Sequence, residues 1–403
     1  MAEKSKVSIV KTQSNPNYEA IRQAVQRSIS LIGGINDIIS PGNLVLINPS
    51  WVAPPVERDA GCITLPEVTQ AIADIVTEMG ARVVIAESSA VGVDTEKVIE
   101  ASGYGELRRK GYNIVDLKKS KSTSQIPVEQ GKVFNAVECF DLVREADVII
   151  SVPKLKTHDQ TEMTCSIKKL KGLLSDKAKR AMHREGLFEG VVDLLSAVKP
   201  KLAVVDAIIC QEGVGPVFGK PVEMDLILAG KDLVAVDATC ARLIGYDPSE
   251  TLLTLNAATR GLGVMDEAHI EVVGVALESV KRRFLRAIED NPVEVEGFDV
   301  VHGEATCTGC RNTVMSALID MRNADQLVYL PGVKIVTGGA PLPQCVPLSN
   351  IVTVGLCMPE ECRTERHVKG CPPNNALIVE AIIGGRAQVK RMYAAETLDK
   401  TEN

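Results

Sequence analysis

The sequence predicts an α/β protein: a layered α/β domain on a mainly parallel sheet, followed by a small cysteine-rich α+β domain. Short runs rich in valine and isoleucine alternate with helix-like segments up to about residue 244. Such strands are typical of parallel sheets that helices cover on both faces. From residue 292 on, cysteine, glycine and proline become more frequent and the elements shorten. We therefore expect one domain over residues 1–291 and a second over residues 292–403.

The elements of the first domain can be predicted in chain order. Apolar runs at 7–10 and 43–49 predict the first two strands, and residues 66–80 predict a helix that begins at a proline and stops at a glycine. Proline at the start and glycine after the end are the signals of a capped helix. The same alternation then predicts strands at 82–88, 146–153, 202–207 and 225–230, and helices at 185–198, 232–244, 248–260 and 278–290.

Composition limits the classes of partner. The formal net charge is −7 and aromatic residues make up only 3% of the chain, which argues against broad binding to nucleic acid or to membrane surfaces. The first residues lack the apolar region of a secretory signal, and no apolar run approaches the length of a membrane span. We expect a cytoplasmic protein that does not insert into membranes and whose partner is an anionic small molecule or a redox protein.

Eleven cysteines form the most informative part of the composition, because clustered cysteines in a reducing compartment more often bind metal or act in catalysis than form disulfides. Five are scattered through the first domain and are expected to be small buried side chains: Cys62, Cys139, Cys165, Cys210 and Cys240. The other six fall between residues 307 and 371: Cys307, Cys310, Cys345, Cys357, Cys362 and Cys371.

The pattern around the late cysteines indicates a metal cluster. Residues 307–310 form C-x-x-C, a spacing found in redox dithiols, zinc sites and iron–sulfur sites. Cys371 is followed by prolines, as a ligating cysteine often is in ferredoxin-type sites. Gly309 and Gly370 add backbone N–H groups that can point at cluster sulfurs. Structural zinc usually takes two close pairs of ligands, and here only the first pair is close.

We therefore predict a 4Fe–4S cluster on Cys307, Cys310, Cys357 and Cys371. Zinc and a metal-free thiol cluster are the alternatives, and Cys345 and Cys362 are substitute ligands.

A lysine-rich stretch, PKLKTHDQTEMTCSIKKLKG at 153–172, follows a strongly apolar strand. In open α/β sheets, ligands bind beyond the carboxyl ends of the strands. Lys154, Lys156 and His158 alternate, so in an extended chain their side chains point to one face. The stretch is either a solvated loop or one wall of an anion site, and its place after a strand favours the anion site. We predict that Lys156 and His158 are catalytic and that Lys154, Thr164 and Lys168 bind substrate.

A second loop supports this site. Asp206 stands at the exit of the strand predicted at 202–207, and Gly213 and Gly215 would let the backbone approach a ligand closely. Glu212 is the acid of the loop. The pattern is neither G-x-G-x-x-G at the start of a helix nor a P-loop, so it predicts no nucleotide site. We predict that Glu212 is catalytic and that Asp206, Gly213 and Gly215 bind substrate.

Other polar positions lie beside this site. Asn48, Trp51, Glu87 and Ser88 close two neighbouring strands and are candidate rim residues. Asp237 lies inside a predicted helix between apolar residues, and it either points to the site or binds a neighbouring backbone group.

Three strings occur in order: VPKLKTHDQTEMTCSIKKLKGLL, VDAIICQEGVGPVFGKP and LAGKDLVAVDATCARLIGYDP. Together, over roughly residues 40–250, they resemble the domain-of-unknown-function family 362, although each alone is unspecific. Members of that family often carry iron–sulfur cysteines in or beside the domain, with a closing G-C-P-P like residues 370–373 here, so the resemblance implies a cluster but no particular reaction. Lys169 departs from the asparagine usual at its position in that family.

A fainter similarity, to the N-terminal domain of lactate racemase-like proteins, rests on PGNLVLINPS and on a histidine after a central strand. It indicates a fold only.

Three functional hypotheses follow. The first is a cytoplasmic iron–sulfur oxidoreductase or reductive activator, whose cluster serves an anionic ligand in the α/β cleft with His158 as the acid–base group. The second is a non-redox enzyme with a structural cluster. The third is a scaffold that delivers an iron–sulfur cluster or a metal to another protein.

Overall fold

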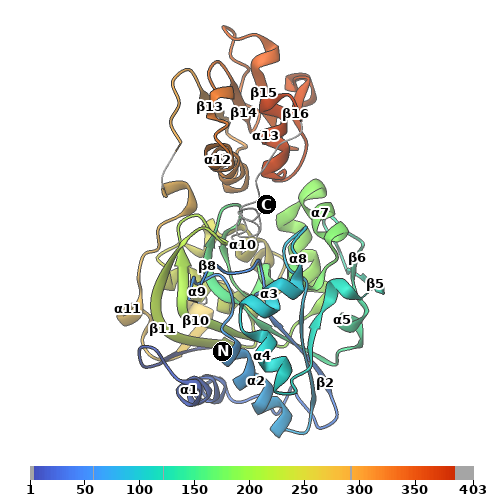
Figure 1. Ribbon diagram of the computed structural model, residues 1–403, viewed down its shortest axis with the longest axis vertical. Coiled ribbons are helices and arrows are strands. Elements are labelled where there is room, and N and C mark those ends of the chain that lie inside the picture. The colour runs from blue at the N-terminus through green and yellow to red at the C-terminus, as the bar shows by residue number, and fades with distance from the viewer. Residues whose placement is uncertain (1–3, 58, 121, 291–292, 386–403) are drawn as a thin grey trace, which may run out of the picture.

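The computed structural model describes residues 4–57, 59–120, 122–290 and 293–385. Within these residues the chain forms a large sheet with helices on both faces and a smaller sheet near the C-terminus (Figure 1). The smaller sheet and its helices stand at one end of the larger body in Figure 1. The fold class is α/β, as the sequence predicts.

Ten strands form the main sheet: β1 (Ser5–Lys11), β2 (Leu44–Pro49), β3 (Arg82–Glu87), β4 (Ile114–Asp116), β7 (Val148–Val152), β8 (Lys154–His158), β9 (Glu162–Thr164), β10 (Leu202–Glu212), β11 (Lys220–Gly230) and β12 (Ile270–Gly274). Their order is β12-β1-β11-β10-β7-β2-β3-β4, with β8 paired to β10 and β9 to β8. The run from β10 to β4 is parallel. β11 runs antiparallel to both of its neighbours.

Helices cover both faces of this sheet: α1 (Tyr18–Leu31), α2 (Pro66–Glu78), α3 (Thr95–Ala101), α4 (Tyr104–Arg109), α5 (Asp141–Glu145), α6 (Ser166–Lys169), α7 (Asp176–Glu185), α8 (Leu187–Val198), α9 (Leu233–Leu243), α10 (Leu252–Thr259) and α11 (Leu277–Val280). A short hairpin of β5 (Thr123–Pro127) and β6 (Ala136–Phe140) lies beside the sheet.

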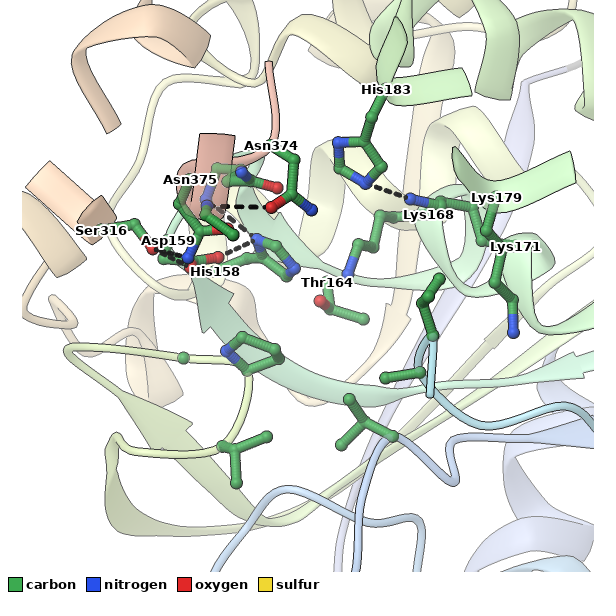
Figure 2. Close-up of a pocket in the computed structure, with 18 of the residues that line it drawn as sticks. His158, Asp159, Thr164, Lys168, Lys171, Lys179, His183, Ser316, Asn374 and Asn375 are labelled. Carbon is green, nitrogen blue, oxygen red and sulfur yellow. Dashed lines mark hydrogen bonds and ion pairs between the residues drawn. The ribbon is translucent and has the colours of Figure 1, made fainter. Parts of the chain in front are cut away.

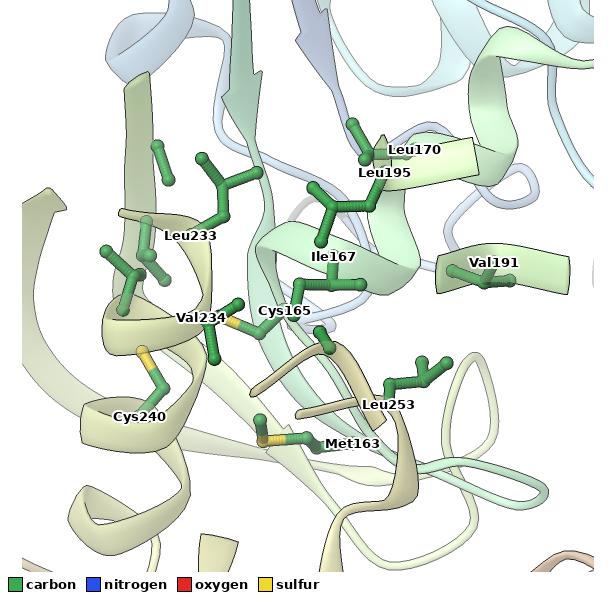
Figure 3. Packing of buried hydrophobic residues seen from close by; sticks show 14 of the residues in the cluster. Met163, Cys165, Ile167, Leu170, Val191, Leu195, Leu233, Val234, Cys240 and Leu253 are labelled. Atoms are coloured by element: carbon green, nitrogen blue, oxygen red, sulfur yellow. The ribbon is translucent and has the colours of Figure 1, made fainter. Parts of the chain in front are cut away.

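Successive residues of a strand point to opposite faces, so each central strand contributes to two cores. In β2, Val45 and Ile47 join the core that contains α1 to α4, whereas Leu46 joins the core that contains α8 to α10. Figure 3 shows the second core, where Cys165 and Cys240 lie among aliphatic side chains. The five scattered cysteines are all buried, as expected of small apolar side chains.

The C-terminal region forms a four-stranded sheet with two helices: β13 (Asp299–His302), α12 (Thr308–Asn323), β14 (Lys334–Thr337), β15 (Ile351–Val354), β16 (Arg366–Val368) and α13 (Asn375–Ile383). All its strands are parallel, an arrangement closer to α/β than to the α+β that its composition predicts. Parallel neighbours require a crossover, and α12 supplies one between β13 and β14. Val314, Ile335 and Val352 lie in its core.

The helix expected over 278–290 does not form as such. Only α11 (Leu277–Val280) and a short 3-10 turn at Ala287–Glu289 are helical there. Between them, Phe284 is fully buried and Arg286 donates to Glu162 at 3.2 Å. These long-range contacts hold the segment against the main body, and they outweigh a helix propensity worth only tenths of a kcal/mol per residue.

Candidate functional site

A cavity of about 600 Å³ lies between the main sheet and the C-terminal region. β8, α7, the 214–218 loop and the segment from α6 into the 3-10 helix η2 (Leu170–Leu173) form one side, and α12 and the start of α13 form the other. In Figure 2, His158 and Asp159 lie towards one end, Thr164 and Lys168 in the middle, and Lys171 towards the other end.

Positive charge dominates the walls. Six lysines and two arginines line the cavity against three carboxylates. All three carboxylates have partners: Glu87 forms an ion pair with Lys169 at 2.8 Å, Asp159 accepts a hydrogen bond from Ser316 at 2.7 Å, and Asp320 accepts one from Asn375 at 2.6 Å. An enclosed surplus of like charge attracts ligands of the opposite sign, so the cavity suits an anion.

Local hydrogen bonds fix the position of the residues in the middle of the cavity. Asp237 of α9 accepts from the backbone N–H of Ser166 at 2.8 Å and of Ile167 at 3.2 Å, which holds the first turn of α6 in position. Burial raises the pKa of Asp237 to about 6. Asp237 therefore binds nearby backbone groups, the second of the two roles considered for it. Thr164 and Lys168, on either side of this turn, face the cavity.

The lysine side chains there are buried, which disfavours their charged form. Burial, together with the neighbouring charges of Lys171 and Lys156, lowers the pKa of Lys168 well below its usual value. Lys171 Nζ lies 3.0 Å from His183 Nε2, and burial lowers the pKa of Lys171 to about 8. An anion that paired with these amines would offset the cost of burying their charge.

His158 ends β8 and is 7% exposed. Burial, followed by the charge of Lys168, lowers its pKa to about 4, so the ring is neutral at pH 7. Its Nδ1 accepts from the N–H of Gln160 at 2.9 Å and lies as close, 2.9 Å, to Asp159 Oδ1. The contact with Gln160 requires Nδ1 without a proton, whereas a hydrogen bond to Asp159 would require Nδ1 to carry one. The backbone N–H of Gln160 is always a donor, which favours the tautomer with its proton on Nε2.

The predicted site residues divide into two groups. Lys156, His158, Thr164, Lys168 and Gly215 line the cavity. The amine of Lys156 also donates to the carbonyl oxygens of Cys62 at 2.6 Å and Pro216 at 3.0 Å, so it ties two loops of the wall together.

The remaining predicted residues make internal contacts. Lys154 and Asp206 form an ion pair at 2.6 Å with side chains 1% and 0% exposed, and Asp206 also accepts from the N–H of Leu65. Glu212 accepts from the N–H of Leu285 at 2.9 Å, and Gly213 donates to the carbonyl oxygen of Leu285. These contacts tie β8, β10 and the segment after α11 together behind the cavity.

Several lining residues had not been assigned a role from the sequence. Lys171 belongs to the lysine-rich stretch, whereas Lys179 and His183 come from α7 and Ser316 from α12. Lys179 and His183 are four residues apart, and Met182 between them is buried, so their shared helix face is the signal that could have found them. No comparable local signal marks Ser316.

The four predicted cysteine ligands come together. Cys307 caps α12, Cys310 lies in its first turn, Cys357 follows β15, and Cys371 precedes α13. The thiol of Cys310 contacts those of Cys307 and Cys357, and Cys371 interacts electrostatically with the same two thiols. A Cβ at Gly355 would come within 3.2 Å of Cys310 Sγ and 3.4 Å of Cys357 Sγ, so glycine leaves room for this gathering.

The chemistry of this donor set fits an iron–sulfur cluster, whose usual ligands are four thiolates. Four thiolates also suit zinc. Within the described residues, however, no group of three or more His, Cys, Asp or Glu side chains is arranged to hold a metal ion. The thiols are thus close to one another, but they do not have the tetrahedral arrangement that would coordinate a single ion. Of the two substitute ligands, Cys345 is exposed and Cys362 packs against a small apolar cluster with Met358.

Comparisons with known proteins identify the family of the chain. Residues 45–242 match the family described as Domain of unknown function (DUF362). The chain is 31% identical over 263 residues to the thylakoid-associated protein sll1697 of Synechocystis sp., a match that covers 63% of this chain and 78% of that protein. The chain belongs to the DUF362 family. The family assignment expected from the three strings is therefore confirmed.

A solved structure, the lactate racemase apoprotein from Thermoanaerobacterium thermosaccharolyticum, is 12% identical with a TM-score of 0.40, covering 84% of this chain and 69% of that chain. That score is too low to establish a shared fold. Among the residues that the structure describes, none of the helices combines the length and the apolar character needed to cross a membrane.

The DUF362 segment and the cysteines meet beside the cavity. Cys371 donates its N–H to the carbonyl oxygen of His183 at 3.3 Å and accepts at its own carbonyl from Leu187 at 2.7 Å. A Cβ at Gly309 would lie 2.5 Å from the ring of Phe188, so α12 and α8 are in close contact here. Because His183 lines the cavity, Cys371 lies next to the cavity wall.

Proposed function

We propose that this DUF362 protein is an iron–sulfur oxidoreductase or reductive activator that serves an anionic ligand in the cavity. The cluster would be a 4Fe–4S cluster on Cys307, Cys310, Cys357 and Cys371. One observation carries the proposal: the thiols of Cys307, Cys310, Cys357 and Cys371 interact with one another, and the backbone of Cys371 bonds to the α7–α8 segment, whose residue His183 lines the cavity. When bound, such a cluster supplies single electrons.

The residues of the chain would divide the remaining work. Lys168 and Thr164 would bind the anion, because both face the cavity from the turn that Asp237 holds. His158 would move a proton, since a neutral imidazole at the wall can accept or donate one. Lys156 would keep the 214–218 loop in place through its bond to Pro216. We propose that Lys154, Asp206 and Glu212 support this wall without contacting the ligand.

The proposed location is the cytoplasm or another reducing compartment, because the cysteine ligands must stay reduced to bind iron.

Metal analysis of the full chain tests the cluster. Protein purified without oxygen should be brown, contain about four irons and four sulfides, and give an electron paramagnetic resonance signal after reduction. The variants Cys307→Ser and Cys357→Ser should lose most of the iron. Cys345→Ser, an exposed cysteine of the same region, is the matched control and should retain it. A colourless wild-type protein that carries one zinc would contradict the proposal.

A structural cluster is the second candidate. The backbone of Cys371 bonds to His183 and Leu187, so a ligated Cys371 would also fasten the C-terminal region to the DUF362 segment. A redox titration separates the two functions. Reversible reduction, with a midpoint potential that shifts when a ligand fills the cavity, supports the redox function. A cluster that neither accepts an electron reversibly nor responds to the ligand supports the structural one.

A further inference from the structure

The middle of the cavity presents a hydrogen-bond donor without a partner. Thr164 is 4% exposed, lines the cavity, and within the described residues its Oγ1 has no hydrogen-bond partner. A buried hydroxyl without a partner is unfavourable, so a ligand that accepts a hydrogen bond from Thr164 would remove that cost.

Two lysines lie on the same wall as Thr164. Lys168 lies beside Thr164 in Figure 2, with Lys171 farther along the same wall. Two nearby carboxylates already have partners, because Ser316 donates to Asp159 Oδ2 and Glu87 is paired with Lys169. Basic side chains therefore outnumber acidic ones around the cavity.

Apolar side chains from several segments also line the cavity. Val52, Val217, Phe218 and Leu377 line it. Phe218 is 51% exposed and Leu377 is 46% exposed, which is unusual for large apolar side chains at a cavity. An exposed aromatic ring beside a charged pocket offers a surface to an apolar or planar group of a ligand.

We propose that the cavity binds a small phosphorylated molecule with an apolar body, its phosphoryl group between Lys168, Lys171 and Thr164. The inference rests on the proposed function only in taking this cavity as the ligand site. A phosphoryl group is favoured over a carboxylate because its three terminal oxygens and double charge can engage two amines and a hydroxyl at once, whereas a carboxylate has two oxygens and one charge. The apolar body would lie against Phe218.

Titration calorimetry on the full wild-type chain tests the phosphoryl group, with inorganic phosphate, acetate and phenyl phosphate as probes. Phosphate should bind at least about tenfold more tightly than acetate, because a charge-assisted hydrogen bond contributes a factor of about ten or more. Phenyl phosphate should bind more tightly than phosphate. Equal affinity for phosphate and acetate, or no binding of phosphate, would overturn the proposal.

Matched variants locate the site. Lys168→Met should weaken phosphate binding by about tenfold to a hundredfold, and Thr164→Val by about twofold to tenfold, whereas Thr164→Ser, which keeps the hydroxyl, should bind as the wild type does. Lys177→Met is the control, since Lys177 lies on α7 with its side chain 86% exposed. Phe218→Ala should abolish the advantage of phenyl phosphate and leave phosphate affinity unchanged. An equal effect of Lys168→Met and Lys177→Met would overturn the site.

The iron content of the same samples separates this inference from the proposed function. Protein that binds phosphate but carries no iron would defeat the cluster alone. Protein that carries about four irons but binds phosphate no more tightly than acetate, and whose variants bind phosphate as the wild type does, would defeat the phosphoryl site alone.

Discussion

Burial brings the pKa values of several cavity lysines close to physiological pH. It lowers the pKa of Lys156 and Lys171 to about 8 and that of Lys179 to about 7. The charges of Lys118 and Lys171 also lower the pKa of Lys179, whereas those of Glu87 and Asp176 raise it. An anion binds best to protonated amines, so the affinity of the cavity for anions should fall as the pH rises above about 8.

The same shifts predict how stability changes with pH. In the unfolded chain these lysines stay protonated up to about pH 10.4, so above pH 7 the unfolded state binds more protons than the folded state. The free energy of unfolding of ligand-free protein should therefore rise with pH, by up to about 1.4 kcal/mol per pH unit for each such lysine. Urea unfolding between pH 7 and 8.5 should show a smaller slope in Lys179→Met than in wild type.

Two comparisons sharpen this measurement. Lys177→Met, at an exposed position of the same helix, is the control and should leave the slope unchanged. The window stops at pH 8.5 because burial raises the pKa values of the Cys139 and Cys210 thiols. Above their unfolded pKa of about 8.5, these thiols make the free energy of unfolding fall as the pH rises, opposite to the lysines. An identical slope in Lys179→Met and wild type would show that Lys179 keeps its charge in the folded protein.

β8 carries both scaffold and site. Lys154 at its start points into an ion pair with Asp206 of β10, and His158 at its end reaches the cavity. Asp206 in turn accepts from the N–H groups of Leu65, before α2, and of Ile208. One buried pair thus joins β8, β10 and the start of α2, and it sets the position from which the cavity residues extend.

Breaking this pair should destabilise the protein without removing its ligand site. Lys154→Met leaves the carboxylate of Asp206 buried without its countercharge, which typically costs about 3–5 kcal/mol. The double variant Lys154→Met/Asp206→Asn removes both charges and should regain part of that loss. Urea unfolding measures both effects. A large loss of phosphate affinity in the double variant, with stability near that of the wild type, would instead place Lys154 in the ligand site.

The main sheet and the C-terminal region meet along two lines. On one, the turn after β8 contacts α12, where Gln160 donates to Thr313 at 2.9 Å and Asn312 donates to Glu162 at 2.8 Å. On the other, the backbone of Cys371 bonds to the α7–α8 segment. Both lines border the cavity, because Gln160 of the first and His183 of the second are among its lining residues. The division into domains at residue 292 stays a prediction.

Removing the proposed cluster should loosen this junction. A chelator added to reduced protein would free Cys371, and the backbone bonds that it makes to His183 and Leu187 would open more often. Hydrogen exchange should then become about tenfold faster at the amides of Leu187 and Cys371. The amides of Leu46 and Ile85, in the middle of the main sheet, are the internal control. Unchanged exchange at Leu187 after complete loss of iron would show that the junction does not depend on the cluster.

Local patterns were sufficient for much of the fold. The helix expected over 66–80 forms as α2 (Pro66–Glu78), because its proline start and glycine end act within one helix. The valine-rich strands lie in a mainly parallel sheet. This could be predicted because a strand buried on both faces has a continuous apolar sequence of its own. The antiparallel direction of β11 carries no such mark, because connections decide strand direction.

The site shows the same division. The amino-acid sequence by itself determined the family, the types of strand and helix, and a set of cysteines and lysines suited to metal and anion binding, because these follow from residue type and short-range spacing. Only the tertiary structure decided that Lys168 faces the cavity while Lys154 is paired with Asp206, and that His183 and Ser316 share its walls. The physical reason is that a side chain is satisfied by whichever partner folding brings within hydrogen-bond distance, and that partner lies far away in the chain.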